Sequence, residues 1–290
     1  MTTAVELGLD VGATLTKIAL VRRRSDALPA FELLPSADLA RVAERLAALD
    51  PVLVGVTGGG AQRLTSLLRC KIRHASEFEA WGAGATLLLR TAPDGPAADG
   101  RFLLVSLGTG TSILLVDRGK TTRVGGTALG GGTLVGLGAA LTGVDFAELC
   151  ALAERGNSAS VDLRVSDIYG PDQIPLAGDL TAANFGKLAR GPRTGSPAEQ
   201  SEQELADRAA GLMRLVGENV ALICAGLSAA TGARQVVYGG STLRGNDPLA
   251  RVLSEVTKMC GLQACFLPHG GFAGALGALE LARAGEGSLT

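Results

Sequence analysis

Two segments of this 290-residue chain share one pattern, in which a short Gly/Thr turn separates two apolar runs. The first segment reads LGLDVGATLTKIALV and turns at residues 12–14. The second reads LLVSLGTGTSILLVD and turns at residues 108–110. Apolar runs joined by so tight a turn are typical of buried, hairpin-connected strands. The repeat therefore predicts two related halves, each opening with a strand hairpin.

Strand and helix patterns alternate along the rest of the chain. Strands are expected at 5–11, 16–21, 51–57, 102–107, 111–117, 120–124, 234–239 and 262–268. Helices are expected at 36–48, 61–69, 76–90, the later part of 125–143, 145–156, 198–231, 247–260 and 272–284. Such alternation predicts α/β halves. A Pro/Gly/Asp-rich loop at 92–100 separates them, which gives one domain at 1–98 and a second at 99–290.

The composition favours a buried α/β core and excludes several other classes of protein. Apolar residues make up 47% of the chain and aromatic residues 3%, so the core is mainly aliphatic. A net charge of −1 offers no electrostatic footprint for nucleic acid or an anionic membrane. Five cysteines without a CxxC pair and two histidines argue against a zinc site. The N-terminus lacks signal-peptide architecture and no apolar stretch is long enough to span a bilayer, so we expect a cytoplasmic protein.

Each Gly/Thr turn has the chemistry of a phosphate site, because it presents backbone N–H groups and hydroxyls at one point. Asp10 precedes the first turn, where a carboxylate can hold Mg²⁺ directly or through water. Lys17 follows it, where an ammonium can reach a phosphate. Neither turn is a Walker A loop, and one such turn alone also occurs as ordinary turn chemistry. Two of them at corresponding points favour a nucleotide cleft between the halves.

A third glycine-rich run, GGTALGGGTLVGLG, spans residues 125–138 and leads into an expected helix. Gly130, Gly131, Gly132 and Thr133 would then lie at the N-terminus of that helix, where free N–H groups and the helix dipole favour an anion. The alternative is a packing junction in which backbone approaches backbone closely.

Taken together, these segments resemble the type II pantothenate kinases over nearly the whole chain. The matching segments are LGLDVGATLTKIALV, SEFEAWGAGATLLL, SLGTGTSILLV with RVGGTALGGGTLVGLGAALTG, DIYGPDQIPLAGDLTAANFGKL, and FLPHGGFAGALGALEL. The RVGGT-x-x-GGGT arrangement is the most specific of them. The resemblance implies two actin-like (ribonuclease H-like) α/β halves with a nucleotide cleft between them.

The resemblance also implies roles for two charged residues. Glu77 matches the general base that takes the proton from the pantothenate hydroxyl, and Arg123 matches the arginine that pairs with the substrate carboxylate. From the residues alone, Glu77 could instead be a helix-end carboxylate, with Ser76 and Glu79 as a rival capping pair. Arg123 could be a solvated arginine at a strand end.

Further contacts follow from the same resemblance. The nucleotide contacts are Asp10, Val11, Gly12, Ala13, Thr14, Leu15, Thr16, Lys17, Thr109, Gly130, Gly131, Gly132, Thr133, Leu134, Phe146 and Ser241, with Asp10 as the residue at the metal. The substrate contacts are Arg123, Thr109, Thr181, Ala182 and Phe272, of which the last three reach into the site of a partner subunit. Packing is the alternative for Phe146 and Phe272. Ala13 stands where the family commonly has glycine, which excludes φ > 0 at that position.

The expected activity is therefore ATP- and Mg²⁺-dependent phosphorylation of pantothenate, the first step of coenzyme A biosynthesis, by a homodimer. Pantetheine or a sugar is an alternative acceptor. The alternative from another class of function is a regulator that binds a nucleotide without catalysing a reaction. The presence of Asp10, Lys17, Glu77 and Arg123 argues against this alternative.

Overall fold

The computed structural model describes residues 4–22, 29–90, 100–170, 173, 178–189 and 201–287. Its strands are β1 (Val5–Val11), β2 (Leu15–Arg22), β3 (Ala30–Pro35), β4 (Pro51–Thr57), β5 (Ile72–His74), β6 (Arg101–Leu107), β7 (Thr111–Asp117), β8 (Lys120–Thr127), β9 (Leu163–Arg164), β10 (Thr181–Ala183), β11 (Gln235–Gly239) and β12 (Gln263–Phe266). Its α-helices are α1 (Leu39–Ala47), α2 (Ala61–Thr65), α3 (Glu77–Leu89), α4 (Gly131–Thr142), α5 (Phe146–Arg155), α6 (Glu202–Thr231), α7 (Asp247–Met259) and α8 (Ala273–Gly287). Its 3-10 turns include η5 (Ser241–Leu243) and η6 (Gly270–Phe272).

Two five-stranded sheets share one topology, which confirms the two related α/β halves. The first sheet has the order β3-β2-β1-β4-β5, and the second has the order β8-β7-β6-β11-β12. In both, the first three strands along the chain are antiparallel neighbours, while the fourth and fifth run parallel to the first. The two Gly/Thr turns therefore occupy equivalent positions, at the tips of β1–β2 and β6–β7.

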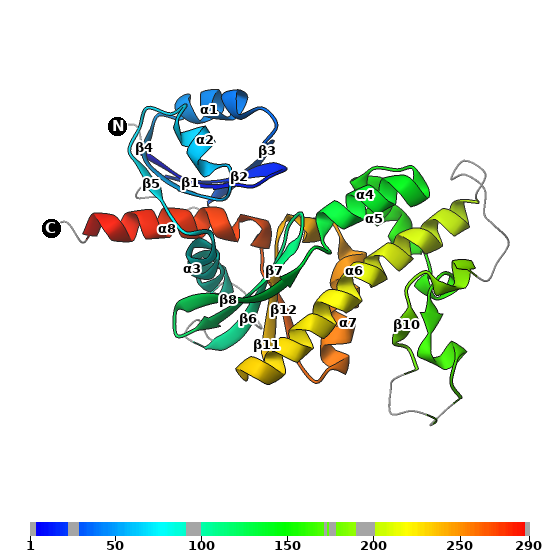
Figure 1. Ribbon diagram of the computed structural model, residues 1–290. Coiled ribbons are helices and arrows are strands. Elements are labelled where there is room, and N and C mark those ends of the chain that lie inside the picture. Colours follow the sequence, from blue (N-terminus) through cyan, green and yellow to red (C-terminus); the bar gives the residue numbers. More distant parts are fainter. Residues whose placement is uncertain are drawn as a thin grey trace.

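Helices α3 and α8 lie between the two sheets, and α6, α5 and α7 cover the far side of the second sheet (Figure 1). The sheet of β1–β5 carries α1 and α2 on its outer face (Figure 1). Helix α8 is the last element of the chain, yet it returns to pack on β1 and β4. The domain boundary expected at 98/99 falls within 91–99, outside the described residues.

The close packing of α3 and α8 accounts for several of the glycines. A Cβ at Gly277 of α8 would lie 1.7 Å from the carbonyl oxygen of Ala80, and one at Gly84 of α3 would lie 1.8 Å from that of Ala273. On the other side of α8, a Cβ at Gly8 of β1 would lie 2.0 Å from the carbonyl oxygen of Ala275. Backbone meets backbone at these crossings, so only glycine fits there.

The expected elements are confirmed. The structure adds four short strands that the sequence patterns did not reveal. The strands β3 and β5 extend the first sheet, and β9 pairs with β10 in a small separate ribbon. Strand β3 is half-exposed along its length, and β5 has only three residues, so neither leaves the apolar alternation that marks a strand.

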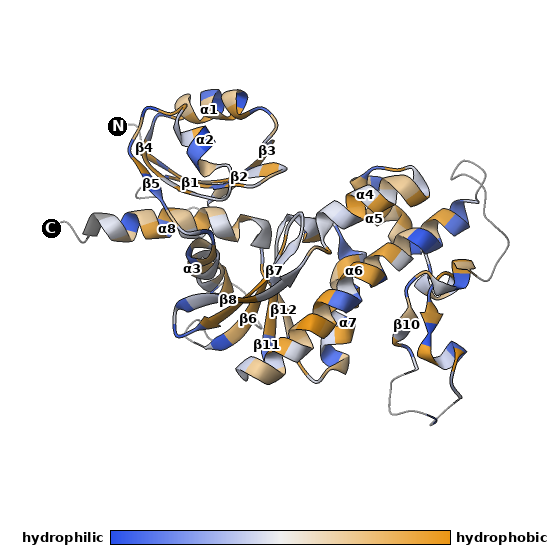
Figure 2. Ribbon diagram, viewed as in Figure 1, coloured by the Kyte–Doolittle hydropathy of each residue, from blue (hydrophilic) through white to orange (hydrophobic). Residues whose placement is uncertain are grey.

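Helix α6 contains an 18-residue window that is apolar enough to resemble a membrane span. Half of that window is buried in the protein, where the helix packs on α4, α5 and α7. Charged side chains are also buried along it, including Arg214 and Glu218, whose Nε and Oε2 atoms are 2.6 Å apart. Orange and blue residues alternate along α6 in Figure 2, as in the core helix of a folded domain.

Candidate active site

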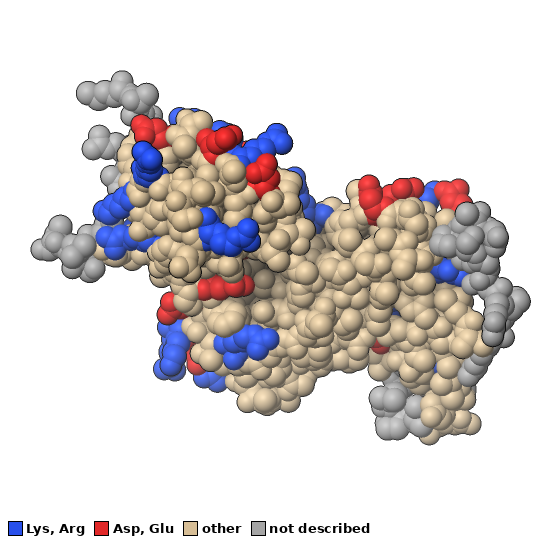
Figure 3. Space-filling view, turned by 45° about the horizontal axis from the view of Figure 1, so that its top comes forward, with Lys and Arg blue, Asp and Glu red and all other residues tan. Residues whose placement is uncertain are grey.

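A cleft of about 490 Å³ lies between the two halves, where the tips of both hairpins meet. It is lined by Asp10, Gly12, Ala13, Thr14, Leu15, Lys17, Gly58, Gly59, Glu77, Trp81, Ser106, Gly108, Thr109, Gly110, Thr111, Ser112, Arg123, Thr127, Gly240 and Ser241. The surface is hollowed between the halves, and charges of both signs are interspersed on the visible face (Figure 3). The fold thus brings together the expected base, the expected substrate arginine and both Gly/Thr turns.

Each turn is closed by a backbone hydrogen bond, and the two turns touch each other across the cleft. The N–H of Gly12 donates to the carbonyl of Leu15 at 3.1 Å, and the N–H of Gly108 donates to that of Gly110 at 2.9 Å. The hydroxyls of Thr14 and Thr109 are 3.4 Å apart and form a hydrogen bond between the halves. A phosphate chain bound between the turns would meet donors from both sides.

Two residues of the first expected phosphate loop face away from the cleft. Val11 and Thr16 are paired across the β1–β2 hairpin and fully buried, because alternate strand residues point to opposite faces. Thr16 forms a hydrogen bond of 3.0 Å with Ser36 instead. Only their backbones remain available to a nucleotide.

Asp10 is buried at the end of β1 and forms an ion pair with Lys17, with 3.2 Å between Oδ2 and Nζ. Burial raises the pKa of Asp10 above its ordinary value, although the cation of Lys17 opposes the shift. No group of three or more His, Cys, Asp and Glu side chains suited to a metal occurs among the described residues. One buried carboxylate fits Mg²⁺, which typically completes its octahedral shell with phosphate oxygens and water.

Glu77 opens α3 and reaches the cleft, whereas Glu79 lies on the other side of the helix. Ser76 makes no side-chain hydrogen bond as N-cap, so the rival capping pair of Ser76 and Glu79 does not form. Glu79 instead lines a separate cavity with Arg73 and His74. Desolvation raises the pKa of Glu77, the nearby charge of Asp10 raises it further, and Lys17 lowers it. A carboxyl with a raised pKa at a cleft is suited to accept a proton.

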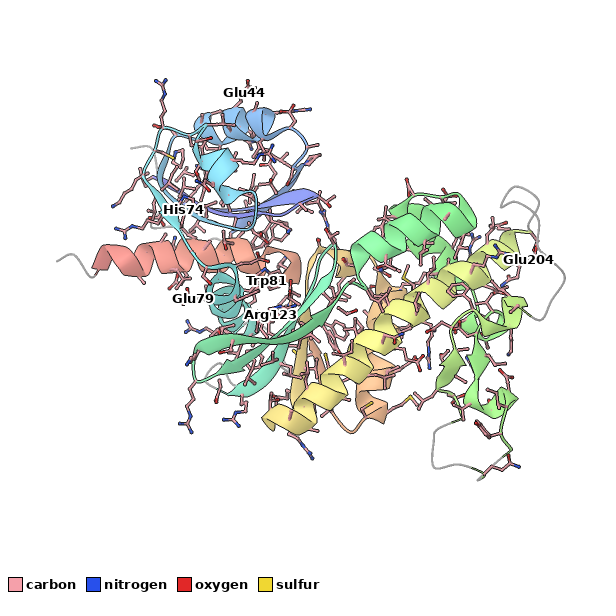
Figure 4. All side chains as sticks on the ribbon, viewed as in Figure 1. Glu44, His74, Glu79, Trp81, Arg123 and Glu204 are labelled. Carbon is pink, nitrogen blue, oxygen red and sulfur yellow. The ribbon has the colours of Figure 1, made fainter. Side chains whose placement is uncertain are left out.

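Arg123 is exposed on β8 and its guanidinium lies over Gly126, where a Cβ would come within 2.7 Å of Nη2. It makes no ion pair or hydrogen bond within the described part of the chain. Figure 4 shows Arg123 and Trp81 near each other between the halves, with Glu79 apart from them. An unpaired guanidinium at the rim of a cleft is suited to hold a carboxylate in a bidentate pair.

The start of α4 is a packing junction, and the expectation of free N–H groups at Gly131 and Gly132 is wrong. These N–H groups donate to the carbonyls of Gly108 and Thr109, both at 2.8 Å, which ties α4 to the second turn. A Cβ at Gly131 would lie 2.5 Å from the hydroxyl of Thr242, so the glycine is required by close approach. The hydroxyl of Thr133 accepts from the N–H of Gly130 at 3.3 Å.

A second cavity of about 420 Å³ adjoins the cleft on the α4 side. It is lined by Thr14, Leu15, Gly108, Thr109, Gly131, Gly132, Val135, Gly136, Phe146, Ser241 and Thr242. The expected contacts Phe146 and Ser241 therefore lie beside Gly131 and Gly132. Gly130 and Leu134 are buried behind this wall and do not line it. The aromatic ring and the small-residue floor are suited to a planar base.

Three expected substrate residues lie outside the cleft of their own chain. The strand β10 carries Thr181 and Ala182, and Thr181 donates to Glu218 from its N–H at 2.9 Å and from its hydroxyl at 2.6 Å. Phe272 is buried in η6 and stacks on Phe31 with ring centroids 4.6 Å apart. Any contact of these residues with substrate needs a second subunit, and remains a prediction.

The structure adds residues that the sequence reasoning did not single out as site residues. They are Gly58, Gly59, Trp81, Ser106, Thr111, Ser112, Thr127 and Gly240. Three of these, Gly58, Gly59 and Trp81, had a detectable signal. The glycine turn after the buried strand at 51–57 was visible in the sequence, and Trp81 stands one helical turn after Glu77, on the same face of α3.

Solved structures of similar shape show which fold this chain has. The (R)-2-hydroxyglutaryl-CoA dehydratase component A of Acidaminococcus fermentans matches with a TM-score of 0.65 and 18% identity, over 98% of this chain and all of that one. A ROK family glucokinase of Streptomyces griseus matches with a TM-score of 0.53 and 15% identity, over 97% of this chain and all of that one. These likenesses confirm the two-lobed α/β fold.

Relatives in sequence are closer. The Fumble family model matches residues 29–280. The type II pantothenate kinase of Oceanobacillus iheyensis is 34% identical, over 94% of this chain and 98% of that protein. The type II pantothenate kinase of Staphylococcus saprophyticus is 31% identical, over 96% of this chain and all of that protein. The chain therefore belongs to the Fumble family, the type II pantothenate kinases.

Proposed function

We propose that this protein transfers the γ-phosphoryl group of ATP to the primary hydroxyl of pantothenate, forming 4'-phosphopantothenate and ADP. This is the first step of coenzyme A biosynthesis. The observation that carries the proposal is the single cleft in which Glu77, Arg123 and both Gly/Thr turns converge. The family relation agrees with it, since the relatives carry the name of this activity.

The nucleotide lies between the halves in this proposal. Its base occupies the cavity of Val135, Phe146 and Ser241, and its phosphates reach the turns at Thr14 and Thr109. Structural neighbours with bound ADPNP or AMPPNP support the use of ATP. Asp10 holds Mg²⁺, which when bound neutralises charge on the phosphates, and Lys17 offers an ammonium to the same groups.

The acceptor binds on the other side of Glu77. Arg123 holds the carboxylate of pantothenate, and Glu77 accepts the proton of its hydroxyl as the oxygen attacks the γ-phosphorus. A new O–P bond forms, the bond from the γ-phosphorus to the bridging oxygen breaks, and ADP leaves. Positioning and electrostatic stabilisation supply most of the rate in such transfers.

The active unit in this proposal is a cytoplasmic homodimer with a shared site. Thr181 and Ala182 lie on a ribbon away from their own cleft, which leaves them available to a partner subunit. Phe272 is assigned to the same role by the family resemblance.

The proposal is tested by measuring ADP release from MgATP with pantothenate, pantetheine or N-acetylglucosamine for the parent protein and for Glu77→Gln. We expect pantothenate to drive turnover, and the glutamine variant to lose at least about 100-fold in kcat, the usual contribution of general base catalysis. Nucleotide affinity, measured by calorimetry, should stay within about twofold.

Glu79→Gln is the matched control, because it removes a carboxylate from the same turn of α3 but outside the cleft. It should retain the parent rate. If the protein binds the nucleotide but no acceptor drives turnover, the proposed kinase activity is wrong and the protein is a nucleotide-binding regulator. If N-acetylglucosamine drives turnover and pantothenate does not, the protein is a kinase but pantothenate is not its acceptor.

A further inference from the structure

The only tryptophan of the chain, Trp81, lines the cleft but has no role in the mechanism above. It stands one helical turn after Glu77 on α3, and its side chain is 95% enclosed, with 5% exposed. Its ring packs beside Gly239, at the end of β11, where a Cβ would lie 3.4 Å from its Cζ3. Trp81 therefore forms the floor of the cleft at the point where α3, β11 and α8 meet.

The indole N–H is an unused donor at this floor. Nε1 makes no hydrogen bond with any residue that the structure describes, and it is not among the polar atoms sealed inside the protein. Both Nε1 and the Oδ2 of Asp10 would lie 2.9 Å from a Cβ at Gly274, in the first turn of α8. Glycine at this position keeps the space open between the indole N–H and the Asp10 carboxylate.

The indole N–H reaches the cleft without a protein partner among the described residues, so it is available to donate a hydrogen bond to a ligand oxygen there. The neighbouring groups indicate which oxygen this is. Asp10 and Lys17 form the end of the first phosphate turn, and Glu77 lies one turn away along the same helix face. The acceptor therefore belongs to a phosphoryl group held between these residues.

We infer that the Nε1–H of Trp81 donates a hydrogen bond to an oxygen of the γ-phosphoryl group of the bound nucleotide. The inference rests on the proposed function for the identity of the nucleotide, and it adds Trp81 to the residues that hold the transferring group. ADP lacks the γ-phosphoryl group and cannot make this contact.

The first test observes the indole N–H directly. Because the chain has one tryptophan, ¹⁵N-labelled protein gives one indole resonance. We expect this resonance to move downfield with Mg–AMPPNP, and to stay near its free position with MgADP or with pantothenate alone. Equal movement with MgADP and Mg–AMPPNP would overturn the inference, as would no movement with either.

The second test compares affinities in Trp81→Phe, which keeps an aromatic ring and removes the N–H. We expect the affinity for AMPPNP to fall about tenfold or more, and that for ADP to change less than about twofold, because a hydrogen bond to a charged oxygen is lost only in the first complex. Equal losses for both nucleotides would mean that the indole only packs.

The matched control is Phe78→Leu, which removes aromatic packing from the same helix but no N–H group. It should lower the unfolding temperature without changing the ratio of AMPPNP to ADP affinity. If Trp81→Phe does not fold, the resonance of the parent protein still decides the question. If the resonance responds to Mg–AMPPNP but pantothenate drives no turnover, the inferred contact of Trp81 with the phosphoryl group stands. The proposed kinase activity is then wrong.

Discussion

Asp10, Lys17 and Glu77 form one set of interacting charges at the cleft. Asp10 raises the pKa of Glu77, and Lys17 lowers it while pairing with Asp10. Burial raises the pKa of both carboxyl groups. The protonation of the expected base therefore depends on the charges of Asp10 and Lys17, the two residues proposed to contact the metal and the phosphates.

This coupling predicts the pH dependence of kcat/KM. Glu77 must be ionised to accept a proton, so the rate falls as pH drops through its raised pKa, at a higher pH than for an ordinary glutamate. Lys17→Met removes a cation and should move this acid limb to still higher pH, while Asp10→Asn removes an anion and should move it lower. Rates are compared within each profile, since both variants also weaken phosphate binding. If the acid limb moves in neither variant, a group other than Glu77 causes it.

At the same scale, Arg123 predicts a defect confined to the acceptor. Arg123→Lys replaces a planar bidentate donor by a point charge, so KM for pantothenate should rise about tenfold or more, with KM for ATP unchanged. Arg118→Lys, in the turn of the same β7–β8 hairpin but outside the cleft, is the control. Steady-state kinetics with each substrate varied measures both constants. An equal rise in both KM values would contradict a carboxylate role.

At the scale of elements, the site depends on tight junctions made by glycine. The second turn is held by α4 through the N–H groups of Gly131 and Gly132. The base-bearing helix α3 is held by α8 through Gly84 and Gly277. Helix α8 in turn packs on β1, whose end carries Asp10, so the positions of Glu77 and Asp10 are fixed relative to each other.

The crossing of α3 and α8 predicts a loss of stability for Gly277→Ala. The new Cβ would lie 1.7 Å from the carbonyl oxygen of Ala80, and the helices would have to separate. Overpacking of this kind typically costs about 1–3 kcal/mol of unfolding free energy, which urea titration measures. Gly226→Ala on α6 is the control, because nothing lies within 4 Å of its Cβ. It should gain about 0.5–1 kcal/mol from helix propensity. If Gly277→Ala leaves the free energy of unfolding unchanged, the two helices can move apart at their crossing without loss of stability.

At the scale of the whole molecule, two halves of identical strand order enclose the cleft from opposite sides. The direct contact across it is the hydrogen bond between Thr14 and Thr109, 3.4 Å long. The ribbon that carries Thr181 and Ala182 is held to α6 by the carboxylate of Glu218, away from this cleft. One chain alone therefore provides the cleft with both turns and Glu77, while the ribbon lies away from it.

A shared site in a homodimer predicts complementation between inactive subunits. Glu77→Gln destroys a site within its own chain, whereas Ala182→Trp should block the site of the partner. Refolding the two variants together at equal amounts should restore about a quarter of the parental activity, since half of the dimers are mixed and each has one intact site. Activity assays across mixing ratios, with sedimentation to establish the dimer, measure this. Ala182→Trp chains that are fully active by themselves would refute the shared site.

Much of the fold followed from local patterns. The helices and the longer strands came from apolar periodicity. The short strands β3 and β5 did not, because half-exposed or three-residue segments carry too little alternation. The prediction of free N–H groups at Gly131 and Gly132 was also wrong. Their carbonyl partners lie on a turn more than 20 residues earlier in the chain, so local sequence could not reveal them.

The sequence by itself determined the two hairpins, the glycine turns and the family, since these depend on residue types at short spacing. Only the tertiary structure decided which side chains share the cleft. It placed Glu77 inside and Glu79 outside, and it aimed the indole of Trp81 at the floor beside Asp10. It also turned the side chains of Val11 and Thr16 away from the cleft. The physical reason is that these outcomes depend on contacts between α3, α8 and the two sheets, which are remote in sequence and are fixed only when backbone packs on backbone.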